Sequence, residues 1–121
     1  GISVHLYPEP CAGQEDGSMI VLTSIGTYDT LVPGDVDTTA EVKFLSNCTY
    51  PGIELLLVGH HGSKRSTGDA WLDAIAPDAA IISVGYNSYG HPTEEALLRL
   101  TDAGMTVYRT DMQGNILITV D

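Results

Sequence analysis

Short apolar runs recur along the chain, and most of them are separated by Gly, Pro, Asn or Asp. Residues 2–7 alternate between apolar and polar side chains, which is typical of a strand with one buried face. Residues 53–58 and 79–84 are nearly all apolar, which is typical of central strands buried on both faces. The pattern predicts seven strands, at residues 2–7, 19–25, 28–32, 53–58, 79–84, 105–109 and 116–120.

Three stretches between these strands have apolar side chains at helical spacing. In the first, Thr38 and Glu41 fit a capping box for a helix that ends near residue 47. Its apolar side chains, which we expect to face inward, are Val42, Phe44 and Leu45.

A second helix is predicted over residues 67–76, where Pro77 stops it. Its apolar stripe consists of Trp71, Leu72 and Ile75. A third helix starts with Pro92 in its first turn and ends at Gly104, a residue suited to a left-handed cap. Its apolar side chains are Leu97, Leu98 and Leu100.

The resulting order, β-ββ-α-β-α-β-α-ββ, predicts an α/β layered domain with a mixed sheet and three helices. Gly26 and Thr27 separate two β-prone runs by two residues, which indicates a tight hairpin. Residues 8–17, rich in Pro, Gly and acidic side chains, are expected to form a loop. The chain has 121 residues, enough for a single domain over residues 1–121 and too few for two.

Composition narrows the possible functions. Apolar residues make up 43% of the chain and charged residues 17%, values of a folded protein rather than a disordered one. No apolar run approaches the roughly 18–20 residues of a membrane helix. Five Lys and Arg against 16 Asp and Glu give a net charge of -11, whereas a non-specific nucleic-acid binder is basic. If the chain handles nucleic acid, bound metal is the obvious source of positive charge.

The two cysteines, Cys11 and Cys48, have neither CxxC spacing nor a second pair. A zinc knuckle is therefore excluded, and a disulfide is possible but not indicated. Isolated cysteines of this kind are more often small core residues or free thiols.

Polar loops with chemically active side chains follow three of the predicted strands. Asp35 follows the third strand, His60 and His61 follow the fourth, and Asn87 and His91 follow the fifth. Ligands usually bind at such strand ends in α/β sheets, because loop amides and helix N-termini converge there. Three histidines and a carboxylate at one edge form a plausible set of ligands for a divalent metal.

Each of these residues also has a purely structural interpretation. Asp35 could cap the following helix, and His60 with His61 could form a turn with one packed and one solvated ring. His91 could be an N-cap-like residue for the helix at Thr93. His5 lies inside an alternating strand and is expected to be structural.

The order of several motifs resembles the C-terminal half of the metallo-β-lactamase-like domain of ComEC-type DNA-uptake (competence) proteins. The resemblance extends from the loop before Ser18 to Val120, and its most specific part is the His-His-Gly-Ser block with a downstream Asn and Gly-His-Pro. The motifs are MIVLTSIG from Met19, TLVPGD ending at Asp35, LLLVGHHGS ending at Ser63, IISVGYN ending at Asn87, GHP at 90–92 and VYRTD at 107–111.

The resemblance implies half of an αββα sandwich and a hydrolytic site with two divalent metal ions, manganese or zinc. It makes Asp35 the bridging metal ligand and His60, in preference to His61, a second ligand. The side chains expected near the scissile phosphate or behind the ligands are His61, Ser63, Asn87 and His91. The implied activity is a nuclease that degrades the DNA strand not taken up, with single-stranded DNA as partner.

The family's principal ligand motif, His-x-His-x-Asp-His, is absent, because the only histidines are His5, His60, His61 and His91. Pro33 precedes the Gly-Asp motif where the family often has Thr, and Glu15 and Asp16 stand where Asn is usual. We therefore expect a half domain whose N-terminal partner half lies upstream, with little or no metal bound and little activity alone. A lone half would expose a sheet face, which favours self-association.

The resemblance also implies a parent in the cytoplasmic membrane, with this segment outside the membrane on its outer side and not touching the bilayer. Two other interpretations remain open. The chain could belong to another metallo-β-lactamase-fold hydrolase that acts on phosphocholine or small phosphodiesters. It could equally be a degenerate domain that has become a binding or structural module.

Overall fold

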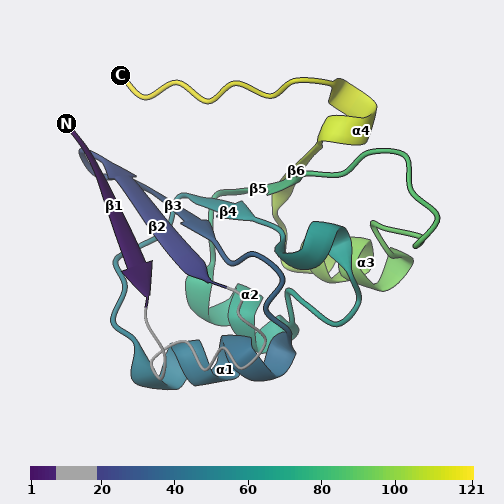
Figure 1. Ribbon diagram of the computed structural model, residues 1–121, viewed down its shortest axis with the longest axis horizontal. Coiled ribbons are helices and arrows are strands. Elements are labelled where there is room, and N and C mark those ends of the chain that lie inside the picture. The colour runs from purple at the N-terminus through teal and green to yellow at the C-terminus, as the bar shows by residue number, and fades with distance from the viewer. Residues whose placement is uncertain (8–18) are drawn as a thin grey trace.

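The computed structural model describes residues 1–7 and 19–121, which form a six-stranded sheet with helices packed on one side (Figure 1). The strands lie side by side in the order in which they occur along the chain. They are β1 (Ile2–Tyr7), β2 (Ile20–Ile25), β3 (Tyr28–Val32), β4 (Leu55–Leu57), β5 (Ala79–Ile82) and β6 (Thr106–Arg109). The helices are α1 (Thr38–Asn47), the 3-10 turn η1 (Gly59–Gly62), α2 (Asp69–Ile75), α3 (Glu94–Asp102) and the one-turn α4 (Thr110–Gln113).

The sheet is mixed, as the sequence predicted. β1, β2 and β3 pair antiparallel, whereas β3, β4, β5 and β6 pair parallel. The antiparallel β2–β3 pair needs only the two-residue turn at Gly26 and Thr27, where Gly26 has a φ of 60°. Each parallel pair needs a crossover, which α1, α2 and α3 supply in turn. The α/β class and the hairpin are therefore confirmed.

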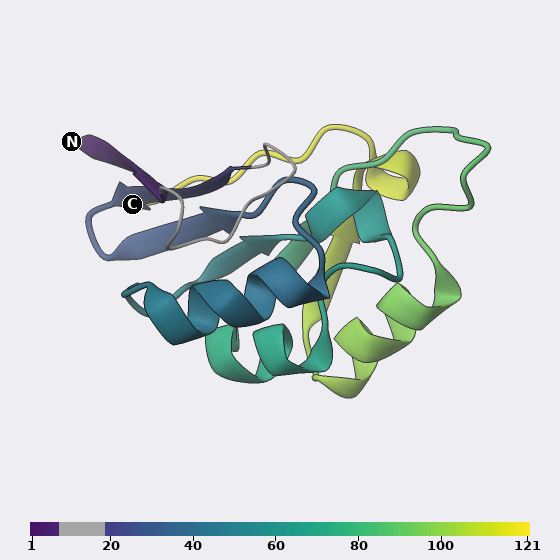
Figure 2. The same cartoon turned by 60° about the horizontal axis from the view of Figure 1, so that its bottom comes forward.

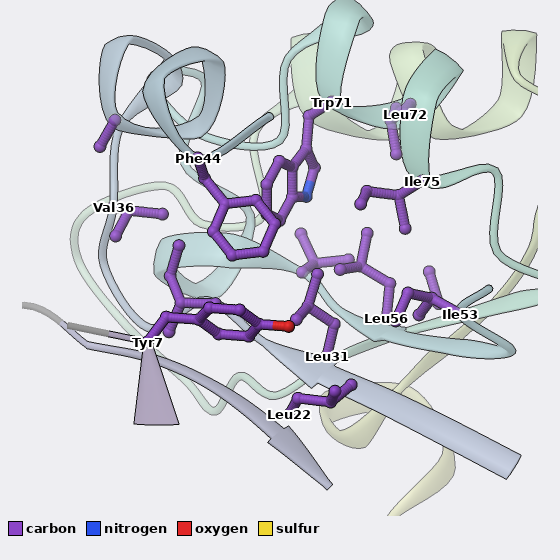
Figure 3. Packing of buried hydrophobic residues seen from close by; sticks show 14 of the residues in the cluster. Tyr7, Leu22, Leu31, Val36, Phe44, Ile53, Leu56, Trp71, Leu72 and Ile75 are labelled. Carbon is purple, nitrogen blue, oxygen red and sulfur yellow. The ribbon is translucent and has the colours of Figure 1, made fainter. Parts of the chain in front are cut away.

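The three longer helices cover one face of the sheet (Figure 2). The strand register places Leu22, Leu31, Leu56 and Ala80 in one row across this face, and all four are buried. Phe44 and Trp71 pack edge to face over this row, with ring centroids 5.4 Å apart (Figure 3). Burial of this row against the helices is the main stabilising term of the fold.

The opposite face of the sheet carries no helix. Its outer strand β1 presents Ile2, Val4 and Leu6, which are 72%, 61% and 53% exposed. Residues 114–121 run in extended form across this face (Figure 2). Side chains from 116–118 line a shallow pocket on it together with Tyr28, Leu55, Ala79 and Tyr108.

The predicted seventh strand at 116–120 is wrong, because these residues form no ladder with a neighbouring strand. The helical turn α4 follows β6 directly, and Gly114 then adopts a φ of 71°. The chain is thereby turned across the sheet instead of returning along the edge of β6 (Figure 1). The apolar run covers part of a face rather than extending the sheet.

The capping box predicted for α1 is wrong, and so is the alternative in which His91 caps the third helix. Asp37, not Thr38, caps α1, and its Oδ1 accepts the Ala40 amide at 2.9 Å. Thr93, not His91, caps α3, and its hydroxyl accepts the Ala96 amide at 3.2 Å. Glu41 is thus not half of a capping box.

The buried side of α1 is narrower than the sequence predicted. Val42 of α1 is 49% exposed, although it was expected to face inward, and Leu98 of α3 is 53% exposed. Trp71, Leu72 and Ile75 of α2 are buried, as predicted.

Cys48 is buried and disulfide-bonded, so of the alternatives that the sequence left open, the free thiol is excluded for this residue. Cys11, the predicted loop at 8–17, and Glu15 with Asp16 lie outside the described residues. Across residues 1–7 and 19–121, no helix has the length and apolar character needed to cross a bilayer.

Candidate functional site

Three loops meet at the end of the sheet to which the parallel strands β3, β4 and β5 point. They comprise residues 33–37, 58–68 and 83–93. These loops carry every side chain that the sequence analysis predicted to be a metal ligand or a catalytic residue. Parallel strands deliver their following loops to a common edge, which is why side chains from distant parts of the chain meet here.

The histidine pair occupies a strained turn. His60 and His61 both adopt left-handed backbone conformations, with φ of 49° and 54°. Such a conformation costs a non-glycine residue about 1–2 kcal/mol, and two in succession are uncommon. The turn is held by the His60 amide, which donates to the Gly34 carbonyl at 2.9 Å. Backbone strain that the surrounding structure maintains is a feature of functional sites.

Gly62 closes this turn against the third loop. A Cβ at this position would lie 2.5 Å from Pro92 Cβ and 2.8 Å from Pro92 Cα, and the residue has a φ of 87°. The Gly62 carbonyl accepts the Thr93 amide at 2.9 Å and the Thr93 hydroxyl at 3.0 Å. Only glycine fits here without displacing the backbone that carries His91.

A buried carboxylate holds the far end of the histidine loop. Glu41 of α1 is only 1% exposed, and its two oxygens accept the Thr67 amide at 2.5 Å and the Gly68 amide at 2.9 Å. Burial raises the pKa of Glu41 to about 7, against the lowering effect of these two amides and of Arg99. The Thr67 hydroxyl in turn accepts the Gly59 amide at 2.9 Å, which fixes the start of the histidine turn.

Further bonds tie the same loop to α1 and α3. The Ser66 hydroxyl donates to the Val36 carbonyl at 2.7 Å, and the Thr38 amide donates to the Arg65 carbonyl at 2.8 Å. Arg99 of α3 donates to the carbonyls of Lys64 and Ser66 at 2.9 and 3.1 Å. The loop that carries the histidines is therefore part of the rigid body of the domain.

Asn87 organises the third loop by itself. Its Nδ2 donates to the carbonyls of Gly85 and His91 at 3.0 and 2.7 Å. Its Oδ1 accepts the amides of Tyr89 and His91 at 3.0 and 3.1 Å. The side chain thus fixes the position of His91, and its own polar atoms are all engaged within the loop.

The three histidines nominated from the sequence lie together. The ring centroid of His60 is 5.5 Å from that of His91 and 6.5 Å from that of His61. His61 Nδ1 lies 2.6 Å from the Ser83 carbonyl. A carbonyl oxygen only accepts, so this contact assigns a proton to Nδ1, and in the neutral ring the lone pair is then on Nε2. Histidines that bind metals or accept protons are commonly held in this way.

The two remaining predicted site residues differ in exposure, because Asp35 is exposed and Ser63 is buried. Asp35 is exposed and is not the cap of α1, and the carbonyl of its neighbour Gly34 holds the His60 amide. Ser63 is 5% exposed, and its hydroxyl accepts the Arg65 amide at 3.2 Å within the turn. In the described part of the chain, no three or more His, Cys, Asp or Glu side chains cluster as a metal site would require.

The sequence alone did not identify three further contributors to this edge. Glu41 gave no signal, because its partners are 26 and 27 residues away in the chain. Tyr86 and Tyr89 stand beside Asn87 in the sequence, and with His61 and His91 they line a pocket of about 190 Å³. The position of Tyr86 and Tyr89 on either side of Asn87 is the sequence feature from which they could have been predicted.

Charge is distributed unevenly around the site. Residues 55–68 and 79–93 contain no Asp or Glu, although the chain has 16 acidic residues. The first of these segments contains Lys64 and Arg65, two of the five basic residues, and both are exposed. The two histidine loops are thus neutral to basic, whereas the third loop of this edge, at 33–37, carries the exposed Asp35 and Asp37.

No protein-family model matches the chain. Sequence comparison finds similarity to ComE operon protein 3 of Bacillus subtilis, with 35% identity over 112 residues and 90% of this chain. Competence protein ComA of Neisseria gonorrhoeae is 37% identical over 83% of the chain. Recombination protein 2 of Haemophilus influenzae is 34% identical over 84%. The chain spans only 14%, 15% and 13% of these relatives, so it corresponds to one segment of much longer proteins.

These matches confirm the predicted similarity to competence proteins, since two of the three relatives carry competence or com-operon names. The metallo-β-lactamase-like domain, the metal ligands and the nuclease activity stay predictions.

Proposed function

We propose that this chain forms one part of a metal-dependent phosphodiesterase site in a protein of DNA internalisation, acting on single-stranded DNA. The observation that carries the proposal is the meeting of His60, His61 and His91 on a strained, well-anchored edge. The two loops that carry the histidines, 58–68 and 83–93, contain no Asp or Glu in a chain of net charge -11, which suits a polyanionic substrate.

The donor types suit manganese or zinc, and their number supports a partial site. Imidazole nitrogens and a carboxylate are ligands that these ions accept. Asp35 and His60 are the ligands we assign to this chain, and the remaining ligands would come from another segment of the longer protein. Bound divalent ions would supply hydroxide near neutral pH and neutralise charge on the phosphate.

The other nominated residues have roles that follow from their surroundings. His61, with Nε2 free, would accept a proton or contact a phosphate oxygen. Ser63 and Asn87 would act by holding the loops, because their polar atoms bond within their own turns. His91, fixed by Asn87, would face the same substrate oxygen as His60.

The face of the sheet opposite α1, α2 and α3, which residues 114–121 cover only in part, is the surface on which we place the other half of the sandwich. A second sheet packed on this face would cover the apolar row Ile2, Val4 and Leu6. In the absence of that half, the same row would favour self-association of this segment. The complete protein would lie in the cytoplasmic membrane, with this domain on its outer side.

The decisive experiment measures cleavage of single-stranded DNA by the complete protein with Mn²⁺ or Zn²⁺. Loss of a residue behind a metal ligand commonly costs 10–100-fold, so Asp35→Ala and His60→Ala should each reduce the rate by more than about 100-fold. Asp73→Ala, an exposed carboxylate on α2, is the matched control and should retain the parent rate. Unchanged cleavage in the Asp35 and His60 variants would show that the domain is a non-catalytic module.

Calorimetric titration of the 121-residue chain separates a partial site from a complete one. We expect weak binding or none for Mn²⁺ and Zn²⁺. Tight binding of two ions that Asp35→Ala abolishes would contradict the half-site and show that the chain carries a full ligand set.

A further inference from the structure

Two tyrosines stand out on the third loop. Tyr86 is 106% and Tyr89 is 83% exposed, the highest exposure among the described large apolar and aromatic side chains apart from Leu117 at 86%. Exposed aromatic rings do not stabilise the core of the domain, because their apolar surface stays in contact with water. Both rings are therefore available to a ligand.

The loop that presents these rings is organised in advance. Asn87 lies between the two tyrosines and accepts the Tyr89 amide at 3.0 Å. Its bonds to Gly85 and His91 span the loop from one end to the other. Fixing the loop before binding lowers the entropic cost of using its side chains for recognition.

The rings continue the row of histidines. The Tyr89 ring centroid is 6.0 Å from that of His91, which is 5.5 Å from that of His60. Tyr86 and Tyr89 line the same pocket as His61 and His91. A polymer bound along this row would meet aromatic faces at one end and imidazoles at the other.

Charge indicates which part of a nucleic acid the loop would contact. Residues 79–93 contain no charged side chain of either sign, so the loop neither repels nor pairs with phosphates. With only five Lys and Arg in the chain, the counterion release that dominates most nucleic-acid binding is weak here. Stacking on uncharged aromatic rings is the source of affinity that this loop itself offers, and it accepts any base that is unpaired.

We propose that Tyr86 and Tyr89 form a stacking platform for unpaired bases of single-stranded DNA whose backbone continues past His60, His61 and His91. This inference rests on the proposed function, because it assigns the platform to the same substrate. It makes the site selective for single strands, since bases within a duplex do not offer their faces.

The test compares binding of two labelled 12-nucleotide strands to the complete protein by fluorescence anisotropy, with divalent metal chelated to prevent cleavage. One strand carries normal bases and the other is abasic. Tyr86→Ala and Tyr89→Ala should each weaken binding of the normal strand by about 5- to 150-fold and leave the abasic strand unchanged. Phe at either position should bind within about twofold of the parent, because phenylalanine keeps the aromatic face.

Tyr108→Ala is the matched control, since this tyrosine lies under residues 116–118 on the other side of the sheet. It should leave both affinities unchanged. Equal affinity of the parent protein for normal and abasic strands, or a preference for duplex, would overturn the platform. Cleavage that depends on Asp35 would still stand in that case, and a base preference without Asp35-dependent cleavage would retain the platform while overturning the proposed nuclease.

Discussion

The two loops that carry the histidines are held in different ways. The loop at 59–68 is bonded to the chain around it, through Glu41, Val36 and Arg99 from elements on both sides. The loop at 85–91 is bonded mainly to itself, through the single side chain of Asn87.

The first loop is therefore fixed by the surrounding domain, whereas the second is fixed by hydrogen bonds within itself. The first loop keeps two residues in a costly backbone conformation, which requires support from the folded domain. The second loop holds the rings of Tyr86 and Tyr89 in solvent. The hydrogen bonds of Asn87 within the loop are enough to keep its conformation. Substitutions in the first loop should therefore change the stability of the whole domain, and those in the second should act locally.

The largest loss of stability is expected from Gly62→Ala, because Gly62 lies where the two loops contact each other. The added Cβ meets Pro92 at 2.5 Å, and alanine must also adopt a φ of 87°. Left-handed backbone costs about 1–2 kcal/mol and overpacking about 1–3 kcal/mol, so we expect a loss of about 3 kcal/mol. Urea unfolding measures this loss.

The control for that substitution is Gly85→Ala, where nothing lies within 4 Å of the new Cβ. Its free energy of unfolding should change by less than about 0.5 kcal/mol. Equal midpoints for the two variants would show that the contact with Pro92 does not constrain the fold.

A pH-dependent effect is expected from Glu41→Gln, which acts on the anchoring of the first loop. The native pKa of about 7 lies above the ordinary value of 4.5, so the native state keeps this proton longer than the unfolded state does. The contribution of Glu41 to the free energy of unfolding therefore falls as pH rises from about 4.5 to about 7, by about 3 kcal/mol. The glutamine variant should lack this fall.

Urea unfolding between pH 4 and pH 8 checks the Glu41 prediction through the difference between parent and variant. Glu95→Gln, on the exposed side of α3, should follow the parent at every pH. A constant difference between the parent and the Glu41 variant would mean that this carboxyl titrates normally.

The smallest effect on stability is expected from Asn87→Ala, which acts on the second loop alone. Four hydrogen bonds are lost, yet all of them lie within residues 85–91. The global free energy of unfolding should fall by less than about 1 kcal/mol, because the loop opens without the core. Hydrogen exchange should become faster at residues 85–91 and stay unchanged at 59–68.

Asn115→Ala, at an exposed position after α4, is the matched control and should leave exchange in both loops unchanged. Faster exchange at residues 59–68 in the Asn87 variant would show that the two loops are coupled rather than separate.

The sequence predicted the parts of the fold that local pattern determines. The hairpin at Gly26, the α2 stripe with Trp71 and the end of α3 near Gly104 follow from spacing and turn chemistry, and the structure has them. The sequence also placed His60, His61 and His91 at one edge, because parallel strands end together.

What could not be predicted depends on partners distant in sequence. Nothing near Glu41 indicates that its carboxylate receives amides from the loop before α2. The apolar run at 116–120 resembles a strand, and only the path of the chain after Gly114 decides that it lies across the sheet. Tertiary context overrode local propensity in both cases.

The part of the sheet face that β1 leaves exposed has a consequence for how copies of this chain behave in solution. An apolar row at Ile2, Val4 and Leu6 attracts over short distances, while a net charge of -11 repels over the Debye length. That length shrinks from about 10 Å at 0.1 M salt to about 3 Å at 1 M, so added salt removes the repulsion and leaves the attraction. At low salt, charge repulsion between copies thus keeps them monomeric, and added salt should promote their association.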